Sequence, residues 1–317
     1  MKRTWIYNAT IVNEGLKFAG SVVVEDDTIC EVLQGEVRPS VPCDAEIDAR
    51  GCYLIPGVID DHVHFRDPGL THKADMASET AAAAAGGVTS FMDMPNCNPQ
   101  TTTLEALENK FADAANKCIV NYSFYFGATN NNTELLQQLD KKHVCGVKLF
   151  MGASTGNMLV DRIESLRKIF SEAGILIAAH CEDQTIIRWN TELVKSKYGE
   201  EDVDILFHPR IRSEEACWRS SSLAVQLAKE TGARFHIHHV STARELELFE
   251  DKPISEKKIT SEACVSHLMF CDEDYKTLGA RIKCNPSIKT KNDRDMLRRA
   301  LTTNRIDVIG TDHAPHL

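Results

Sequence analysis

The sequence predicts an α/β protein in which a (β/α)8 barrel follows a small β module. Short apolar runs alternate with helical stretches from residue 54 onward, a pattern typical of a parallel sheet. There are eight such runs, the number of strands that closes a barrel. Polar residues stand at the ends of several runs, where barrel enzymes carry their chemistry. The runs are 54–63, 88–94, 119–126, 146–151, 175–179, 234–240, 259–263 and 306–310.

The first 53 residues predict the β module. Residues 4–12 and 20–25 have strand composition, and Glu25-Asp26-Asp27 predicts a turn. We therefore expect two domains, the β module at 1–53 and the barrel at 54–317.

Helical stretches separate the apolar runs of the barrel. Gly86-Gly87 and Gly174 stand where a helix should end before a strand. The segment 185–218 does not fit one helix and predicts an insertion after the fifth strand. The expected helices are 73–85, 104–116, 133–139, 162–173, 220–231 and 293–303.

Composition excludes several classes of protein. The formal charge of -10 and the lack of a basic patch argue against nucleic acid and anionic membranes as partners. The eleven cysteines are scattered without a C-x-x-C pair, which favours reduced thiols in a cytoplasmic protein. The N-terminus lacks the pattern of a signal peptide, and no apolar run approaches the roughly 20 residues of a membrane helix.

The run 54–63 leads into two histidines one residue apart. Side chains at positions i and i+2 of a strand share a face, so His62 and His64 are expected to lie side by side and could bind one metal ion. Alone, the pair also fits a solvated strand end. The metal interpretation depends on ligands from other strand ends.

Residues of ligand type end four other runs. Ligand-type residues at five of eight strand ends are hard to explain by chance, so the sequence predicts a metal centre at the C-terminal face of the barrel. The further candidates are Lys148, His180, His236, His238, His239 and Asp312.

Lys148 lies inside an apolar strand and has two interpretations. It could be a buried lysine paired with an acid, since a lone ammonium there would lose several kcal/mol of hydration. Alternatively, its neutral amine could take up carbon dioxide, and the resulting carbamate could bridge two metal ions.

The other candidates also have structural alternatives. His180 could be a core histidine with satisfied hydrogen bonds, and Asp312 could be a helix N-cap. Strand alternation puts His236 and His238 on one face and His239 on the other. Periodicity alone does not choose between these two faces.

Taken together, these residues resemble the amidohydrolase superfamily, and within it the dihydroorotases with a two-metal site. The resemblance extends from the β module to Leu317. It implies a TIM-type barrel of the metal-dependent hydrolase kind, with residues 1–53 as the N-terminal part of a β-sandwich. Its most specific pieces are the segment 56–69, Met94-Pro95-Asn96, and Asp312-His313-Ala314-Pro315-His316.

The resemblance implies two zinc ions per subunit. The two histidines of the first strand would bind the more buried ion, a carboxylated lysine would bridge both ions, and the histidines of strands five and six would bind the second. The aspartate would be both a ligand and the catalytic proton carrier. The implied ligands are His62, His64, Lys148, His180, His239 and Asp312.

Substrate-binding residues are also implied. Dihydroorotate carries a carboxylate, and Arg66 on the same strand face as His64 could bind it with a bidentate fork. Asn96 and His316 would add donors to that carboxylate, and Asn285 matches a family position near the substrate. The alternative for Asn96 and Asn285 is turn chemistry beside proline.

The reaction implied is the reversible cyclisation of N-carbamoyl-L-aspartate to L-dihydroorotate in de novo pyrimidine synthesis. In the hydrolytic direction, a hydroxide bridging the two ions would attack the ring carbonyl, with Asp312 as general acid and base.

Members of the family continue past the eighth strand, whereas this sequence ends at Leu317. We therefore expect a barrel that lacks its closing helix. Two partners besides the small substrate fit the resemblance: further copies of the chain, as a homo-oligomer, and aspartate transcarbamoylase.

Three rival functions remain. A dihydropyrimidinase or an allantoinase would share the metal ligands, although Arg66, Asn96 and His316 favour an anionic substrate. The sequence Gly152-Ala153-Ser154-Thr155-Gly156 matches the nucleophile elbow of serine hydrolases, but no helix is expected to start at the serine. The chain could also be a catalytically silent dihydroorotase-like subunit, although such subunits usually lose ligands and this chain has them all.

Overall fold

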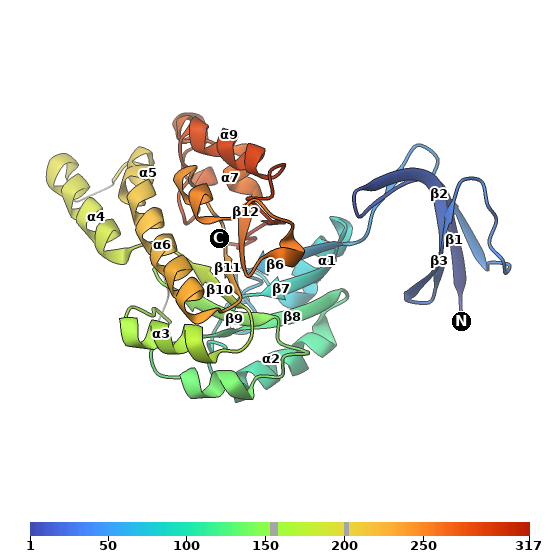
Figure 1. Ribbon diagram of the computed structural model, residues 1–317, viewed down its shortest axis with the longest axis horizontal. Helices are drawn as coiled ribbons and strands as arrows, with labels where there is room; N and C mark the ends of the chain where they lie inside the picture. The colour runs from blue at the N-terminus through green and yellow to red at the C-terminus, as the bar shows by residue number, and fades with distance from the viewer. Residues whose placement is uncertain (153–157, 200–202) are drawn as a thin grey trace. The chain divides into compact units, whose positions relative to one another are not determined.

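The computed structural model describes residues 1–152, 158–199 and 203–317. It divides into two compact units, Met1–Val58 and Ile59–Leu317 (Figure 1). The predicted nucleophile elbow at 152–156 lies almost entirely outside the described residues, which resume at Met158.

The N-terminal unit is a five-stranded mixed sheet with the order β3-β2-β1-β4, in which β5 also pairs with β1. β1 pairs with β2 antiparallel and with β4 and β5 parallel. Its small apolar core contains Ala9, Ile11 and Val22. The strands are β1 (Arg3–Asn13), β2 (Leu16–Glu25), β3 (Thr28–Gln34), β4 (Ala45–Asp48) and β5 (Tyr53–Leu54).

The second unit contains the predicted eight-stranded barrel, and its strands neighbour one another in sequence order. Each strand from β7 to β13 pairs in parallel with its neighbour in that series. A bridge between Val63 and His313 joins the two ends of the sheet. The (β/α)8 prediction is thus confirmed. The strands are β6 (Val58–Val63), β7 (Val88–Asp93), β8 (Asn121–Gly127), β9 (Gly146–Phe150), β10 (Ile177–His180), β11 (Phe235–Ile237), β12 (Ile259–Cys264) and β13 (Val308–Gly310).

The prediction of one continuous strand over 54–63 was wrong. Leu54 pairs with Ile11 in the N-terminal sheet, and the first barrel strand begins only at Val58. Pro56 lies between the two strands; because proline has no backbone N–H to donate to a sheet, it interrupts the apolar run.

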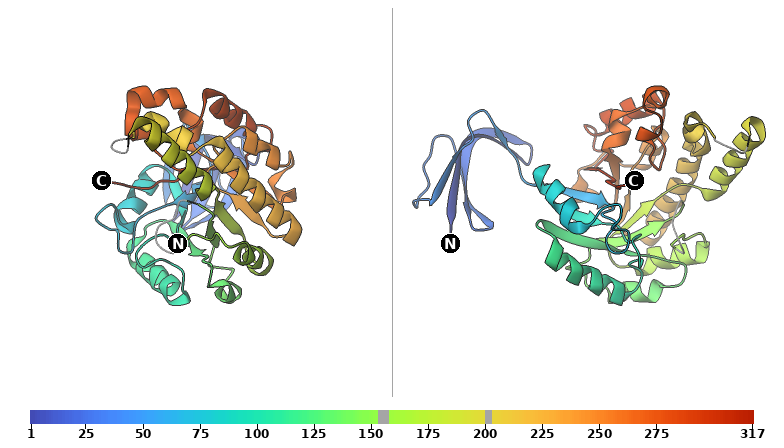
Figure 2. Two further views of the ribbon diagram at one scale, coloured as in Figure 1. Left: turned by 90° about the vertical axis from the view of Figure 1, so that its left-hand side faces the viewer. Right: turned by 180° about the vertical axis from the view of Figure 1, so that it is seen from behind.

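Helices cover the outside of the barrel, as α2, α3 and α6 show around β8 to β10 in Figures 1 and 2. α6 starts at Glu214, earlier than expected, because Ser213 accepts a hydrogen bond from Ala216 N as its N-cap. It ends at Gly232, whose φ of 72° is typical of a C-terminal glycine. The other long helices are α1 (Met76–Ala85), α2 (Leu104–Lys117), α3 (Ile163–Glu172), α4 (Gln184–Tyr198) and α9 (Lys291–Ala300), and α6 is Glu214–Thr231.

The expected insertion after the fifth barrel strand consists of α4, a 3-10 turn η2 and the short helix α5. The stretch 133–139, expected as an α-helix, is the 3-10 helix η1. Among the described residues, no helix is long and apolar enough to cross a membrane. The remaining elements are η1 (Thr133–Gln138), η2 (Ile205–Phe207), α5 (His208–Ile211), η3 (Arg244–Leu248), η4 (Ile254–Glu256), α7 (Val265–Met269), η5 (Asp272–Asp274), α8 (Tyr275–Leu278) and η6 (Gly279–Ile282).

Candidate metal centre

Three of the predicted ligands meet at the C-terminal ends of β6 and β13. His62 Nε2 lies 3.2 Å and His64 Nε2 lies 3.1 Å from the same atom, Asp312 Oδ1. Ligand atoms bonded at 2.0–2.1 Å around a tetrahedral ion lie about 3.3 Å apart, so these separations suit donors that share one ion. The three side chains therefore lie close enough together to bind one ion.

Hydrogen bonds orient both histidine rings. His62 Nδ1 donates to Glu262 Oε1 at 2.9 Å, and His64 Nδ1 donates to Asn96 Oδ1 at 2.8 Å. Both partners are oxygen acceptors, so each Nδ1 carries a proton, and each Nε2 is the nitrogen that could bind an ion beside Asp312 once it is unprotonated.

The charges around Asp312 favour its ionised form. Burial opposes ionisation, but His62 and His64 outweigh it and hold the pKa of Asp312 well below its usual range. Burial likewise disfavours the charged His62 ring, yet the carboxylates of Glu262 and Asp312 raise the pKa of His62 to about 10. This concentration of buried charge is what a bound cation would neutralise.

A second pair of ligands lies at the ends of β10 and β11. His180 Nδ1 is 2.9 Å from His239 Nε2. His180 Nε2 donates to Glu182 Oε2 at 2.8 Å, and Arg212 also contacts that carboxylate. Glu182 thus fixes the tautomer in which His180 Nδ1 is free to bind an ion.

The last histidine of the sixth predicted strand lies beyond the end of that strand in the structure. β11 ends at Ile237, and His239 has a positive φ of 41°, so strand alternation no longer applies there. His238 and His239 are both buried, with ring centroids 6.3 Å apart. His236 and His238 take part in a different cluster.

Lys148 lies within β9 and is 1% exposed. Its Nζ is 2.7 Å from His238 Nδ1. Burial lowers the pKa of Lys148 to about 8, which leaves part of its amine uncharged near neutral pH. This is the form that can react with carbon dioxide.

The predicted substrate residues fall into two places. Arg66 donates from Nε to Pro315 O at 3.1 Å, and its Nη2 lies 3.0 Å from His316 Nε2. Asn96 contacts His64, so these residues gather beside the ligands. Asn285 is exposed, and its Oδ1 lies 3.2 Å from His208 Nε2, so the structure ties it to α5 rather than to the ligands.

Two residues of the centre have backbone conformations that non-glycine residues rarely adopt. φ is 66° at Arg66 and 51° at Asp312. Such strain persists where the surrounding structure imposes it, and it concentrates at functional sites. Together with His239, these positions support a functional role for the C-terminal ends of β6, β11 and β13.

Sequence reasoning missed three carboxylates, the buried Glu182 and Glu262 and the half-buried Asp61. Glu262 accepts from His62, and it also accepts from the backbone N–H of His239 at 2.9 Å. An acidic residue in the interior of the predicted strand 259–263 was the signal that could have identified it, because an isolated buried carboxylate is costly. In the sequence, Asp61 directly precedes the predicted ligand His62, and Glu182 lies two residues after the predicted ligand His180.

The donor set suits borderline metal ions. Four imidazoles, one carboxylate and a lysine able to become anionic are ligands that zinc and related ions prefer, whereas calcium or magnesium would prefer all-oxygen sites. The residues present therefore fit a metal centre.

Comparison with known proteins places this site in a family. The amidohydrolase family model matches residues 53–317. The chain is 32% identical to an allantoinase of Deinococcus radiodurans over 284 residues, 87% of the chain and 62% of that relative. It is also 32% identical to a dihydroorotase of Methanosarcina mazei over 328 residues, 100% of the chain and 69% of that relative.

The solved structure of an L-hydantoinase (dihydropyrimidinase) from Arthrobacter aurescens is similar over the whole chain. The TM-score is 0.92 at 26% sequence identity, and the match covers 70% of the hydantoinase chain. The chain thus spans about two-thirds of the length of these relatives, and the activities in their names differ from one another.

Proposed function

The chain belongs to the amidohydrolase family, and on that basis we propose that it is a zinc-dependent dihydroorotase of pyrimidine biosynthesis. In this proposal the protein closes N-carbamoyl-L-aspartate to L-dihydroorotate and reopens the ring in the reverse direction. The relatives are named as an allantoinase, a dihydroorotase and a hydantoinase, all enzymes that act on cyclic amides but on different substrates. The choice among these substrates therefore depends on this chain's own residues.

The observation that carries the proposal is the polar group beside the metal ligands. Arg66 and His316 are in contact, and Asn96 uses its oxygen to accept from His64. The side-chain NH2 of Asn96 therefore remains a donor. A cationic fork and an amide donor at this position suit a substrate with a carboxylate, and dihydroorotate has one.

We propose that two zinc ions are held by His62, His64, His180, His239, Asp312 and a carboxylated Lys148. When bound, such a pair of ions would polarise the ring carbonyl and lower the pKa of water.

Lys148 contributes to this centre through a covalent change. Its uncharged Nζ attacks the carbon of carbon dioxide, a C–N bond forms and one proton leaves, so that the neutral amine becomes an anionic carbamate. The pKa of about 8 makes the uncharged amine accessible near neutral pH. Burial of Lys148, which lowers this pKa, also keeps bulk water away from the carbamate.

Asp312 carries the proton in the proposed reaction. Its carboxylate is ionised, so it can accept a proton from the attacking water and deliver it to the ring nitrogen as the C–N bond breaks. The hydrogen bonds that His62 donates to Glu262 and that His64 donates to Asn96 hold the two rings beside it.

The experiment compares the turnover of dihydroorotate, dihydrouracil, hydantoin and allantoin by the zinc-loaded protein. We expect dihydroorotate to be preferred, and Asp312→Asn to reduce kcat by about 10²- to 10⁴-fold with the fold retained by circular dichroism. Preference for an uncharged ring, or near-normal turnover by the variant, would refute the assignment.

The second candidate is an allantoinase, favoured by the 32% identity to the Deinococcus relative. Allantoin is uncharged, so its turnover should not depend on Arg66. Metal-loaded protein that acts on none of these substrates would instead indicate a silent subunit.

A further inference from the structure

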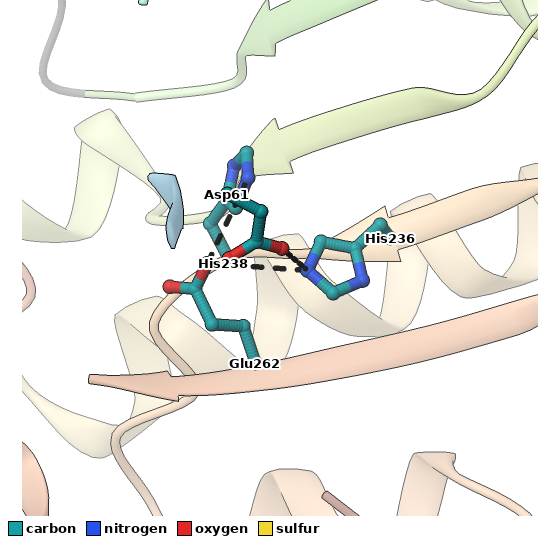
Figure 3. A group of neighbouring side chains, drawn as sticks. All are labelled: Asp61, His236, His238 and Glu262. Carbon is teal, nitrogen blue, oxygen red and sulfur yellow. Dashed lines mark ion pairs between the residues drawn. The ribbon is translucent and has the colours of Figure 1, made fainter. Parts of the chain in front are cut away.

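A second group of potential ligands lies in the barrel beside the centre described above. It consists of Asp61, His236, His238 and Glu262 (Figure 3). Asp61 comes from β6, His236 from β11 and Glu262 from β12, while His238 follows β11 directly. None of the proposed catalytic ligands belongs to this group.

The four side chains converge on one point. His236 Nε2 is 3.6 Å from Asp61 Oδ2 and 4.0 Å from Glu262 Oε2, and His238 Nε2 is 3.8 Å from the same Glu262 oxygen. One ligand atom from each residue lies within 4.8 Å of all the others. These three nitrogen–oxygen separations exceed by about 0.3–0.7 Å the spacing of about 3.3 Å expected around a tetrahedral zinc ion, so the side chains would move inward when an ion binds.

Several atoms of the group are buried without a hydrogen-bond partner among the described residues, while Asp61 Oδ2 is the carboxylate oxygen nearest to His236. Asp61 Oδ1, His236 Nε2, His238 Nε2 and Glu262 Oε2 are buried without a hydrogen bond. The side chains of His236, His238 and Glu262 are 4%, 0% and 0% exposed. Buried polar atoms are usually paired, so several unpaired atoms aimed at one point indicate a missing ligand.

The other ring nitrogen, Nδ1, of both His236 and His238 already has a hydrogen-bond partner. His236 Nδ1 lies 2.8 Å from Thr260 Oγ1, and His238 Nδ1 lies 2.7 Å from Lys148 Nζ. With Nδ1 donating to the Thr260 hydroxyl, His236 Nε2 keeps a lone pair for a metal ion, and His238 Nε2 does so in the tautomer that carries its proton on Nδ1.

The two carboxylate oxygens of Glu262 also differ in their partners. Oε1 accepts from His62 Nδ1, from the His239 backbone N–H and from Cys264 Sγ at 3.0 Å. Oε2 faces the histidines alone. One oxygen therefore serves the first centre and the other serves this group.

Gly310 of β13 makes room for the two carboxylates. β13 lies between β12 and the closing edge at β6, so any side chain there would separate Glu262 from Asp61. A Cβ on Gly310 would lie 2.7 Å from Glu262 Oε2 and 3.1 Å from Asp61 Oδ1. Glycine thus lets acids from two non-adjacent strands approach each other.

We propose that Asp61, His236, His238 and Glu262 form a third metal site that binds a zinc-like divalent ion. Two imidazoles and two carboxylates neutralise one divalent charge within the barrel and satisfy the unpaired atoms together. Oxygen-preferring ions such as magnesium fit less well, because half of the donors are nitrogen.

The ion has a structural consequence for the first centre. It joins β6 to β11 and β12 across β13, where the barrel is closed by the bridge between Val63 and His313. It also holds Glu262, whose other oxygen orients His62. The site therefore acts as a clamp behind the catalytic ligands.

The test counts metal ions. Purified protein is loaded with zinc, desalted and measured by elemental analysis beside His236→Gln. We expect the wild type to retain one equivalent more than this variant. The matched control is His267→Gln, because His267 is also buried with an unpaired ring nitrogen but lies outside the group; it should retain the wild-type number.

Equal zinc in the wild type and His236→Gln would overturn the proposal. Anomalous diffraction above and below the zinc edge from wild-type crystals gives a second answer that needs no variant. A peak between His236 Nε2, His238 Nε2 and Glu262 Oε2 supports the site, and water density without anomalous signal refutes it. Neither measurement depends on which cyclic amide the protein hydrolyses.

Discussion

In the proposed centre, the hydrogen-bond partner of one nitrogen of a side chain decides what its other nitrogen can bind. Glu262 and Asn96 select the tautomers of His62 and His64, and Glu182 selects that of His180. Arg66 differs, because its Nε is already bonded to Pro315 O while the end of its guanidinium lies beside His316. Its terminal nitrogens are the part available to a substrate.

Replacing Arg66 by lysine tests this role. Lysine keeps the charge but loses the planar fork, so KM for dihydroorotate should rise about 10- to 100-fold with little change in kcat. Steady-state kinetics measure the effect. The control is Arg50→Lys, an arginine with a side chain 79% exposed in the N-terminal unit. An unchanged KM would contradict a carboxylate-binding role.

A buried histidine away from the proposed ligands predicts a pH dependence of stability. Burial is the main cause that lowers the pKa of His267 to about 4, and its Nε2 donates to Pro286 O at 2.9 Å. An unfolded histidine has a pKa of about 6.5. Between pH 6.5 and 4 the unfolded state therefore binds a proton that the folded state refuses, and stability falls as the pH falls.

Denaturant unfolding at pH 7.5 and pH 5 checks this effect. The wild type should lose about 2 kcal/mol more than His267→Gln over this interval, because glutamine keeps a donor but does not titrate. The difference between the two proteins cancels the contributions of the other histidines. Equal losses would mean that His267 does not contribute to the acid sensitivity.

At the scale of elements, the last strand determines what its neighbours can do. β13 contributes Gly310, and Asp312 follows it with a positive φ. Glu262 on β12 is held by His62, His239 and Cys264, so it cannot easily move away from a new side chain on β13. The absence of a side chain at one position therefore permits the carboxylate arrangement in two strands.

Gly310→Ala should consequently destabilise the barrel by about 1–3 kcal/mol through overpacking against Glu262. The matched control is Gly86→Ala, where φ is -82° and a Cβ would lie 3.5 Å from the nearest atoms. This variant should be neutral or slightly stabilising. Chemical denaturation of both proteins decides, and equal stability would show that Glu262 yields to the methyl group.

At the scale of the whole molecule, the barrel is notable for its polar interior. The buried ionisable residues of the barrel include His62, Lys148, His236, His238, His239 and Glu262. Burial of this many ionisable groups is unfavourable unless they are paired or bind ions. We infer that metal ions contribute to the stability of the fold as well as to the proposed reaction.

Removal of metal ions should therefore lower the thermal stability of the protein. Bound ions present at about 1,000 times Kd stabilise by about 4 kcal/mol, which corresponds to a fall in Tm of roughly 10 °C on chelation. Differential scanning calorimetry with and without chelator measures it. Zinc or cobalt should restore Tm and magnesium should not; a Tm unaffected by chelator would contradict the inference.

The sequence alone determined the alternation of strands and helices, and with it the barrel. It also determined which residue types stand at the strand ends, because both patterns depend on local order along the chain. His62 and His64 were expected side by side from strand geometry, and the structure places both against Asp312. The broken strand at Pro56 was missed because the apolar run looked continuous.

Only the tertiary structure decided which distant side chains meet. His62 and Glu262 are 200 residues apart in the chain, yet they are hydrogen-bonded. The orientation of His239 depends on a backbone turn past the end of β11, which strand periodicity does not encode. The contact of Asp61 with the strand-six histidines requires closure of the barrel across Gly310, since side chains on β6 and β12 approach each other only when the sheet curves back on itself.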